Sequence, residues 1–418
     1  MQHVDPLANP PAAALPSASR LDPSVGWRDG DDGHARIDAP ISVDFTHRLR
    51  FTRDLFDPAN PILREIVELD PESPRRVLVV VDAGVARARP DLDRLIEAYS
   101  AAHPGSMRLV SRPIVVEGGE DAKNTTHVLD EVHTAIHLRR ICRRSYVLAI
   151  GGGAMLDAVG LAAATAHRGV RIIRVPTTTL AQDDAAVGVK NGINLFGKKN
   201  YFGTFAVPWA VLNDERFLDT LPDREFLAGL SEIVKVALVK DGGFFEWIER
   251  EAERLAAREM PFVGAAIRRS AELHLGHIVS GGDPFEVKEA RPLDFGHWSA
   301  HRLEQETRFA LRHGEAVAIG VALDTLYSAR TGRIDGADAL RVLRCLRAMR
   351  LPISHPKLLD PEVLRGGLED FREHLGGRVT ISVLDRLGAA SDVHVVDIDT
   401  MVACAEELAA FAESAAGA

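Results

Sequence analysis

Histidine and glutamate side chains occur at spacings that suit a divalent metal ion. Glu232 lies in GLSEIVKVALVKD, and His313 opens HGEAVAIG. His297 and His301 are four residues apart in DFGHWSAHRLE, so a helix would place both on one face. A borderline ion such as Zn²⁺ accepts imidazole nitrogen and carboxylate oxygen, and three of these four groups would suffice. Any one histidine alone is better explained as a hydrogen-bonded, partly buried side chain. The glycines beside His297 and His313 make the two explanations equally good, so the residues alone leave this hypothesis open.

A second region, residues 149–205, has the composition of a phosphate-binding site. An apolar strand ends there in three glycines, Gly151–Gly153, and a helical pattern follows. Backbone N–H groups at a glycine-rich helix start can cradle a pyrophosphate. Upstream, Glu120 and Lys123 lie on another strand-to-helix turn, where they could contact a ribose and a phosphate. Taken alone, that pair is better explained as a helix N-terminal carboxylate and a surface lysine.

Residues 176–200 are predicted to form a loop with many polar groups. Its polar side chains include Thr177, Thr178, Thr179, Asp183, Asp184, Lys190, Asn194, Lys199 and Asn200. A solvated surface loop rarely combines such groups with so many small residues and so few glutamates. We therefore expect this loop to bind phosphate or a polyol.

The composition limits the class of protein. A chain of 418 residues is long enough for two domains, each with its own core. The net charge of −10 argues against nucleic acid as a partner, and the three cysteines show no CxxC spacing. No apolar run approaches the roughly 20 residues of a membrane helix, and the N-terminus lacks the pattern of a signal peptide. We therefore expect a cytoplasmic protein that does not bind membranes.

Alternating strand and helix patterns predict an α/β domain over residues 41–215, after a flexible arm at residues 1–40. The run Arg76–Asp82 is almost continuously apolar and β-branched, which is typical of a strand buried on both faces. Ligands of such parallel sheets bind at the carboxyl ends of the strands. Further strands are expected at 42–51, 109–116 and 146–150, and helices at 60–69, 91–103 and 124–143.

Helical patterns dominate the rest of the chain, so a mostly α-helical second domain is predicted over residues 216–418. One alternating stretch, Arg378–Leu384, predicts a short strand near the end. The helices are expected at 223–240, 243–259, 262–278, 298–307, 314–329 and 336–347.

Seven motifs together resemble the sugar-phosphate cyclases, the 3-dehydroquinate synthase superfamily, over residues 75–390. They are GGEDAK, GGGAMLD, RGVRIIRVPTTTLAQDDAAVGVKNGIN, GKKNYFGTF, LPDREFLAGLSEIVK, FGHWSAH and LRHGEAVAIG. The resemblance implies an N-terminal Rossmann-like parallel-sheet domain that binds NAD. It also implies a mostly α-helical domain with a divalent metal ion, Zn²⁺ or Co²⁺, and a homodimer in which Arg168 reaches the neighbouring site.

The resemblance also assigns a role to each motif residue that this chain retains. The metal ligands are Glu232, His297 and His313. The contacts with NAD map to Asp82, Glu120, Lys123, Gly152, Gly153, Asp157, Thr177, Thr178 and Leu180. Catalytic roles map to Lys190, Lys235, His301 and Asp184, and substrate contacts map to Arg168, Lys199 and Asn200.

The reaction that the resemblance implies uses NAD without consuming it. NAD⁺ takes hydride from a ring hydroxyl that the metal polarises, and the new ketone acidifies the adjacent C–H so that phosphate can leave. NADH then returns its hydride, the ring opens, and an intramolecular aldol step closes a carbocycle. The lysines and Arg168 would hold the phosphate, and such positioning and charge stabilisation can supply most of the rate.

The chain departs from dehydroquinate synthases where those enzymes bind the substrate's carboxylate. Their Lys, Arg and Asn are here Gly276, Ala290 and Asp294, and Arg291 is one residue out of register. Their late Lys–Lys pair is replaced by FREHLGG, with His374 nearby. Without bidentate cation donors the pocket should bind a carboxylate poorly, and the Asp294 carboxylate would accept hydrogen bonds from substrate hydroxyls instead.

This pattern is similar to the cyclases that convert sedoheptulose 7-phosphate to valiolone-type C7 cyclitols. His301 keeps the dehydroquinate-type residue, however, and GHWSAH lacks the Thr of the GHTWSP motif found in 2-epi-5-epi-valiolone synthases. Three alternatives stay open: dehydroquinate synthase itself, an iron-type alcohol or glycerol dehydrogenase on the same architecture, and a non-catalytic binding protein. The lysine-rich phosphate loop speaks against the second, and the intact metal ligands speak against the third.

Overall fold

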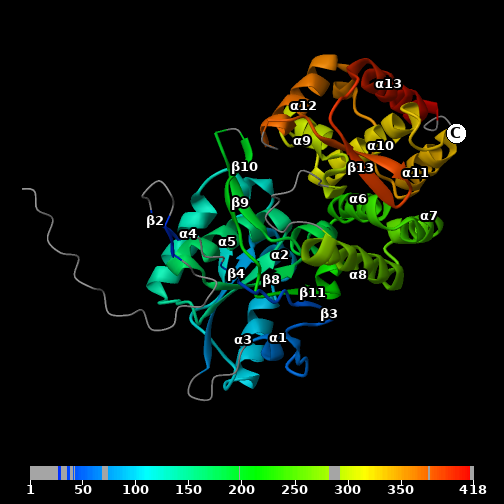
Figure 1. The fold of residues 1–418 in the computed structure, drawn as a ribbon. Coiled ribbons are helices and arrows are strands. Elements are labelled where there is room, and N and C mark those ends of the chain that lie inside the picture. The colour runs from blue at the N-terminus through cyan, green and yellow to red at the C-terminus, as the bar shows by residue number, and fades with distance from the viewer. Residues whose placement is uncertain are drawn as a thin grey trace, which may run out of the picture. The chain divides into compact units, whose positions relative to one another are not determined.

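The computed structural model describes residues 27–29, 35–37, 41, 43–67, 74–196, 198–281, 292–374 and 377–414 (Figure 1). The chain divides into two compact units, Met1–Thr46 and His47–Ala418. In the first unit, β1 (Trp27–Asp29) pairs antiparallel with β2 (Ala35–Ile37). The rest of the predicted flexible arm at residues 1–40 lies outside the described residues.

A parallel sheet forms the centre of the N-terminal half of the second unit (Figure 1). Its strands pair in the order β3-β11-β8-β7-β4-β5, and β6 also pairs with β4. All of these pairings are parallel, as the alternating pattern predicted. The strands are β3 (Leu49–Thr52), β4 (Arg75–Asp82), β5 (Met107–Leu109), β6 (Ile114–Val116), β7 (Tyr146–Gly151), β8 (Arg171–Pro176) and β11 (Ala210–Asp214).

Helices cover both faces of this sheet, because the side chains of each strand alternate between two cores. Leu78 and Val80 of β4 belong to the core that α4 (His127–Leu138) and α5 (Gly153–Thr165) complete. Val77, Val79 and Val81 belong to the opposite core, which α1 (Ile62–Ile66) and α3 (Leu92–Ala102) complete. The predicted α/β class is therefore confirmed, and β4 is buried on both faces as expected.

Three predicted elements are shorter or divided. The strand expected from Ser42 begins only at Leu49, and Ser42 itself lies outside the described residues. The strand expected at 109–116 is two strands, β5 and β6, because the intervening Pro113 cannot donate to a ladder. The helix expected at 124–143 ends at Leu138, and Arg140 shortly beyond has a left-handed φ of 51°.

The predicted loop at 176–200 is wrong in its second half, which is a β-hairpin (Figure 1). β9 (Lys190–Leu195) pairs antiparallel with β10 (Lys198–Phe205). Glycines allow the two backbones to approach closely, since a Cβ on Gly203 would lie 2.4 Å from the carbonyl oxygen of Asn191. Glycine, asparagine and lysine are rare in strands and common in loops, so this segment lacks the composition that predicts a strand.

The C-terminal half is mostly helical, as predicted, and α10 (His313–Arg330) lies at its centre. α10 contacts α6 (Asp223–Lys240), α9 (His297–Glu306), α11 (Gly336–Ala348) and α13 (Ile398–Ser414). Its residues 314–328 are buried except Glu315, which explains why its pattern is apolar almost all round. The other elements are α7 (Gly242–Ala256), α8 (Met260–Gly276), α12 (Pro361–His374), β12 (Ile381–Arg386) and β13 (Ala389–Val393).

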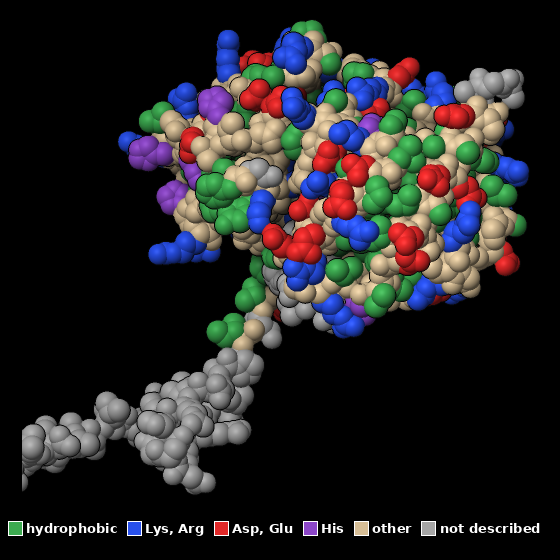
Figure 2. Space-filling model, turned by 90° about the horizontal axis from the view of Figure 1, so that it is seen from above, with side chains coloured by type: hydrophobic (Ala, Val, Ile, Leu, Met, Phe, Trp, Pro, Cys, Tyr) green, Lys and Arg blue, Asp and Glu red, His purple; other side chains and the backbone are tan. Residues whose placement is uncertain are grey.

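The sequence did not predict α12, α13 or β13, whereas the late strand that it predicted is β12. The domain boundary expected near residue 215 falls just after β11, and it stays a prediction. Within the described part of the chain, no helix is both long and apolar enough to cross a bilayer. Figure 2 shows acidic and basic side chains interspersed over one face of the molecule.

Candidate active site

A cavity of about 460 Å³ lies beyond the carboxyl ends of β7 and β8 and extends to the helical half. It is therefore at the edge of the sheet where the parallel topology predicted a ligand. Residues from both halves of the second unit line it. Those named from the sequence are Glu120, Lys123, Gly153, Asp157, Leu180, Asp184, Lys190, Lys199, Asn200, Lys235, Asp294, His297, His301 and His313.

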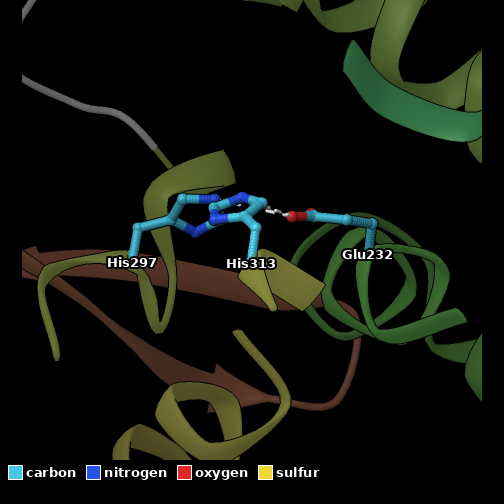
Figure 3. Close-up of side chains that lie close together, drawn as sticks. All are labelled: Glu232, His297 and His313. Carbon is cyan, nitrogen blue, oxygen red and sulfur yellow. Dashed lines mark ion pairs between the residues drawn. The ribbon is translucent and has the colours of Figure 1, made fainter. Parts of the chain in front are cut away.

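Glu232, His297 and His313 meet at the helical side of this cavity (Figure 3). The Nε2 atoms of His297 and His313 each lie 3.6 Å from Oε1 of Glu232. Glu232 is fully buried, and its Oε1 has no hydrogen-bond partner among the described residues. An orphaned carboxylate oxygen that faces two imidazoles is what a bound divalent cation would satisfy. The three side chains therefore fit the metal that the sequence predicted.

The charges around these side chains also favour a metal ion. Burial alone would raise the pKa of Glu232, but the ammonium of Lys235 and the imidazole of His313 together lower that pKa to about 2. Burial holds the pKa of His297 well below its usual value, so this imidazole is neutral. The side chain of His313 is 20% exposed. Its partial burial would lower its pKa, but the carboxylates of Glu304 and Glu232 raise it to about 9, so a metal ion must displace a proton there.

Two glycines fix the start of α9 and thereby orient His297. Gly296 has a left-handed φ of 79°, and a Cβ there would lie 2.6 Å from the backbone nitrogen of Val321. A Cβ on Gly320 would lie 2.0 Å from the carbonyl oxygen of Gly296. The buried carboxylate of Asp324 accepts hydrogen bonds from Gly296 N at 2.9 Å and from Trp298 Nε1 at 3.0 Å. α9 is thus held tightly against α10.

The residues assigned to NAD surround the ends of β4, β7 and β8. Asp82, which does not line the cavity, caps α2 (Ala83–Ala88) by accepting a hydrogen bond from Gly84 N. Gly152 caps α5, and a Cβ on it would lie 3.4 Å from the side chain of Thr178. The backbone N–H of Thr177 donates to the carbonyl of Gly151 at 3.0 Å. These contacts gather the predicted residues at one edge of the sheet.

Glu120 and Lys123 belong to a 3-10 turn that faces α5. Lys123 Nζ donates to Asp157 at 2.7 Å and to Asn200 Oδ1 at 2.6 Å. Asn194 in turn accepts a hydrogen bond from the backbone of Asn200. Oε2 of Glu120 is buried and has no hydrogen-bond partner in the described part of the chain. That acceptor and the glycine-rich start of α5 fit a dinucleotide that offers a ribose hydroxyl and a pyrophosphate.

Gly276 stands where dehydroquinate synthases carry the first of their carboxylate-binding residues. Gly276 ends α8 and does not line the cavity, and a Cβ on it would meet nothing within 4 Å. His274 and His277 line the cavity instead, and Nδ1 of His274 lies 2.9 Å from Asp184 Oδ1. α8 is followed directly by a π-helical turn at His277–Gly281. Ala290 and Arg291 lie outside the described residues, as does the side chain of His374.

Arg168 lies apart from this cavity. It lines a second hollow with Cys142, Arg143, Arg144, Thr165 and His167. His167 and Arg168 both have left-handed φ values, 52° and 62°, so the turn after α5 is sharply bent. That Arg168 reaches the site of a neighbouring subunit stays a prediction.

Glu304, which is fully buried on α9, was not predicted from the sequence. Both of its carboxylate oxygens lie 2.8 Å from Lys199 Nζ, and Oε2 lies 3.0 Å from Nδ1 of His313. One available signal was helical spacing, because Glu304 follows His297 by seven residues and His301 by three on the same helix.

We expect Asp183→Val to stabilise the protein. Asp183 is fully buried beside Asp184, and neither of its carboxylate oxygens has a hydrogen-bond partner among the described residues. Removing such a group should raise the free energy of unfolding by about 1–3 kcal/mol. Burial raises the pKa of Asp183 well above the 3.8 of the unfolded chain, and the carboxylates of Asp184 and Glu232 add to this. Urea unfolding of the metal-free protein at pH 5 and pH 8 would measure the gain.

The sign of the pH dependence follows from that raised pKa. Wild-type stability is fully present below the unfolded pKa of 3.8 and is lost as the pH rises through the folded pKa of Asp183. The advantage of the valine variant should therefore be larger at pH 8 than at pH 5. A variant that is less stable than wild type at both pH values would show that Asp183 has a stabilising partner.

Comparison with known proteins supports the resemblance seen in the motifs. The family model for the 3-dehydroquinate synthase N-terminal domain matches residues 113–228, and the model for the C-terminal domain matches residues 229–370. A 2-epi-5-epi-valiolone synthase from Actinomyces sp is 33% identical over 370 residues, 87% of this chain and 95% of that protein. A 3-dehydroquinate synthase from Methylococcus capsulatus is 35% identical and covers 79% of this chain and 89% of its own length.

One solved structure is also similar over almost its whole length. It is ValA, a 2-epi-5-epi-valiolone synthase from Streptomyces hygroscopicus subsp. jinggangensis 5008, with NAD⁺ and Zn²⁺ bound. Its TM-score is 0.80 at 30% identity, and the match covers 89% of this chain and 99% of that one. The fold therefore agrees with the family that the motifs indicate.

Proposed function

The chain belongs to the 3-dehydroquinate synthase family of sugar-phosphate cyclases, and we propose that it acts on a neutral heptulose phosphate, sedoheptulose 7-phosphate. The product would be a carbocyclic C7 cyclitol, formed with elimination of phosphate. The observation that carries this proposal is the wall of the cavity built by Asp184, His274 and Asp294. A substrate carboxylate there would face two aspartates, whereas hydroxyl groups could donate to them.

The distribution of cations in the cavity supports the same substrate class. Its lysines are Lys123, Lys190, Lys199 and Lys235, and no arginine lines the cavity among the described residues. Lys235 is already paired with Glu232 at 2.5 Å and lies 3.9 Å from Asp184. A second anionic group on the substrate would therefore lack a bidentate cation there.

The proposal includes NAD and one divalent metal ion. Glu232, His297 and His313 would hold the metal, and the residues around Gly152 and Glu120 would hold NAD; ValA carries both groups. When bound, they supply a reversible hydride acceptor and a Lewis acid that polarises the substrate hydroxyl.

The chain's own side chains would bind the phosphate and move protons. Lys199, Asn200 and Lys190 line the cavity and would stabilise the phosphate as it leaves, with Arg168 of a neighbouring copy in the proposed homodimer. Burial holds the pKa of His301 well below its usual value, so this imidazole is neutral and can accept a proton from a substrate hydroxyl. Lys235 stays an ammonium, because Glu232 and Asp184 raise its pKa despite its burial.

Phosphate release tests this proposal. Purified protein with NAD⁺ and Zn²⁺ or Co²⁺ should release phosphate from sedoheptulose 7-phosphate without net formation of NADH. The carboxylated heptulosonate phosphate used by dehydroquinate synthases should react at least tenfold more slowly, the effect of about 1.4 kcal/mol of lost transition-state binding. Turnover of the carboxylated substrate alone would make the protein a dehydroquinate synthase.

Dehydroquinate synthase is the second candidate, because curated enzymes of that name are as similar to this chain as the valiolone synthases are. His301, the dehydroquinate-type residue, also lines the cavity. An alcohol or glycerol dehydrogenase would be distinguished by stoichiometry, since only that activity accumulates NADH.

A further inference from the structure

Glu304 connects two parts of the cavity that come from distant segments of the chain. It lies on α9, and its side chain is 1% exposed. Its two oxygens hold Lys199 Nζ, which comes from β10, at 2.8 Å each. Oε2 also lies 3.0 Å from Nδ1 of His313, the first residue of α10. One buried carboxylate therefore contacts a metal ligand and a lysine of the substrate pocket.

The contact with His313 determines which ring nitrogen is available for a metal. A carboxylate accepts hydrogen bonds, so the proton of His313 resides on Nδ1 when the ring is neutral. Nε2, which faces Oε1 of Glu232 at 3.6 Å, is then the free lone pair. Carboxylates that hold a metal-binding histidine in this way fix its tautomer and its orientation, and losing one typically weakens metal binding about 10- to 100-fold.

The contact of Glu304 with Lys199 likewise fixes the position of the lysine ammonium. The side chain of Lys199 is 12% exposed, and a flexible ammonium in that position needs a counter-charge. The geometry is bidentate, since both carboxylate oxygens are equally distant from Nζ. Glu304 thus keeps the ammonium at the cavity wall, where a phosphate group can share it.

We propose that Glu304 is a positioning residue that holds the metal ligand His313 and the substrate lysine Lys199 in one arrangement. This inference rests on the metal and phosphate sites of the proposed function. It differs from a purely structural ion pair, because removing the carboxylate should weaken two separate binding events. Neither event requires turnover to be measured.

The test compares Glu304→Gln with Glu306→Gln. Glu306 lies on the same helix, but it faces Arg302 at 2.8 Å and Lys357 at 3.4 Å, away from the cavity. Zn²⁺ affinity of the metal-free protein would be measured by competition with a chromophoric chelator. Inorganic phosphate affinity would be measured by calorimetry in the presence of NAD⁺ and Zn²⁺ at saturating concentration.

We expect E304Q to weaken Zn²⁺ binding at least tenfold and phosphate binding roughly tenfold, while E306Q changes neither by more than about twofold. Lys199→Met should weaken only phosphate, because Glu304 remains to hold His313. Glu304→Asp keeps the charge and should recover part of both affinities. E304Q values within twofold of wild type for either ligand would overturn the proposal.

Folding is checked by thermal unfolding of each variant. If E304Q does not fold, the double variant K199M/E304Q carries the test, because it removes the lysine together with its counter-charge. Its Zn²⁺ affinity should still be at least tenfold below that of K199M, and equal affinities would overturn the proposal. Failure of the proposed function is a different result, namely a wild-type enzyme that releases no phosphate from either sugar phosphate.

Discussion

Replacing His313 with alanine should abolish stoichiometric Zn²⁺ binding and lower phosphate release by roughly 10³-fold or more. The imidazole of His313 is one of three side chains whose ligand atoms lie within 4.8 Å of one another, so its loss leaves only Glu232 and His297. A Lewis acid contributes several kcal/mol to such a reaction, and each 1.36 kcal/mol is tenfold in rate. Metal content after dialysis and the rate of phosphate release from sedoheptulose 7-phosphate would measure the two effects.

A matched control is His133→Ala. His133 lies on α4, far in sequence from Glu232, His297 and His313, and its Nε2 contacts Thr165 Oγ1 at 2.9 Å. That variant should keep one metal ion per chain and wild-type phosphate release. If H313A retained both Zn²⁺ binding and phosphate release, the metal would have to bind elsewhere, and the assignment of Glu232 and His297 as ligands would be wrong as well.

The fold was predictable where a strand or helix is defined by its own apolar pattern. β4 and β7 are buried along most of their length, and α6 has the bounds that periodicity predicted. The hairpin β9–β10 could not be predicted in this way, because its stability comes from pairing and from contacts made by Asn191. The side chain of Asn191 is buried and accepts a hydrogen bond from Arg174, 17 residues earlier in the chain.

The grouping of side chains around the cavity could be predicted where motifs carry them, but not where it depends on contacts between distant segments of the chain. Glu232, His297 and His313, to which the resemblance assigns a metal, lie close together although they come from three helices. His274 and His277 line the cavity but were not named from the sequence, because the end of α8 is irregular and its inward-facing residues follow no simple spacing. Glu304 escaped notice because a glutamate on an amphipathic helix is usually solvated, and its partner Lys199 is 105 residues away.

Lys235 is the buried cation that compensates the carboxylates of the site. Its side chain is 2% exposed, and its Nζ lies 2.5 Å from Glu232 and 3.9 Å from Asp184. Burial would lower the pKa of Lys235, but these two carboxylates raise it, so the side chain remains charged. The two carboxylates would lose this compensating charge if the lysine were removed, unless another cation replaced it.

We therefore expect Lys235→Met to destabilise the metal-free protein by about 3–5 kcal/mol, the cost of leaving a buried charge unpaired. A divalent ion at Glu232 would restore a positive charge, so Zn²⁺ should stabilise this variant more than it stabilises wild type. Denaturant unfolding with EDTA and with Zn²⁺ would measure both values. Lys240→Met is the control on the same helix, because Lys240 contacts His277 Nδ1 at 3.0 Å instead of the metal ligands. A K235M protein as stable as wild type in EDTA would contradict this expectation. It would mean that Glu232 is protonated in the variant, and that Lys235 is not the group that keeps Glu232 ionised for metal binding.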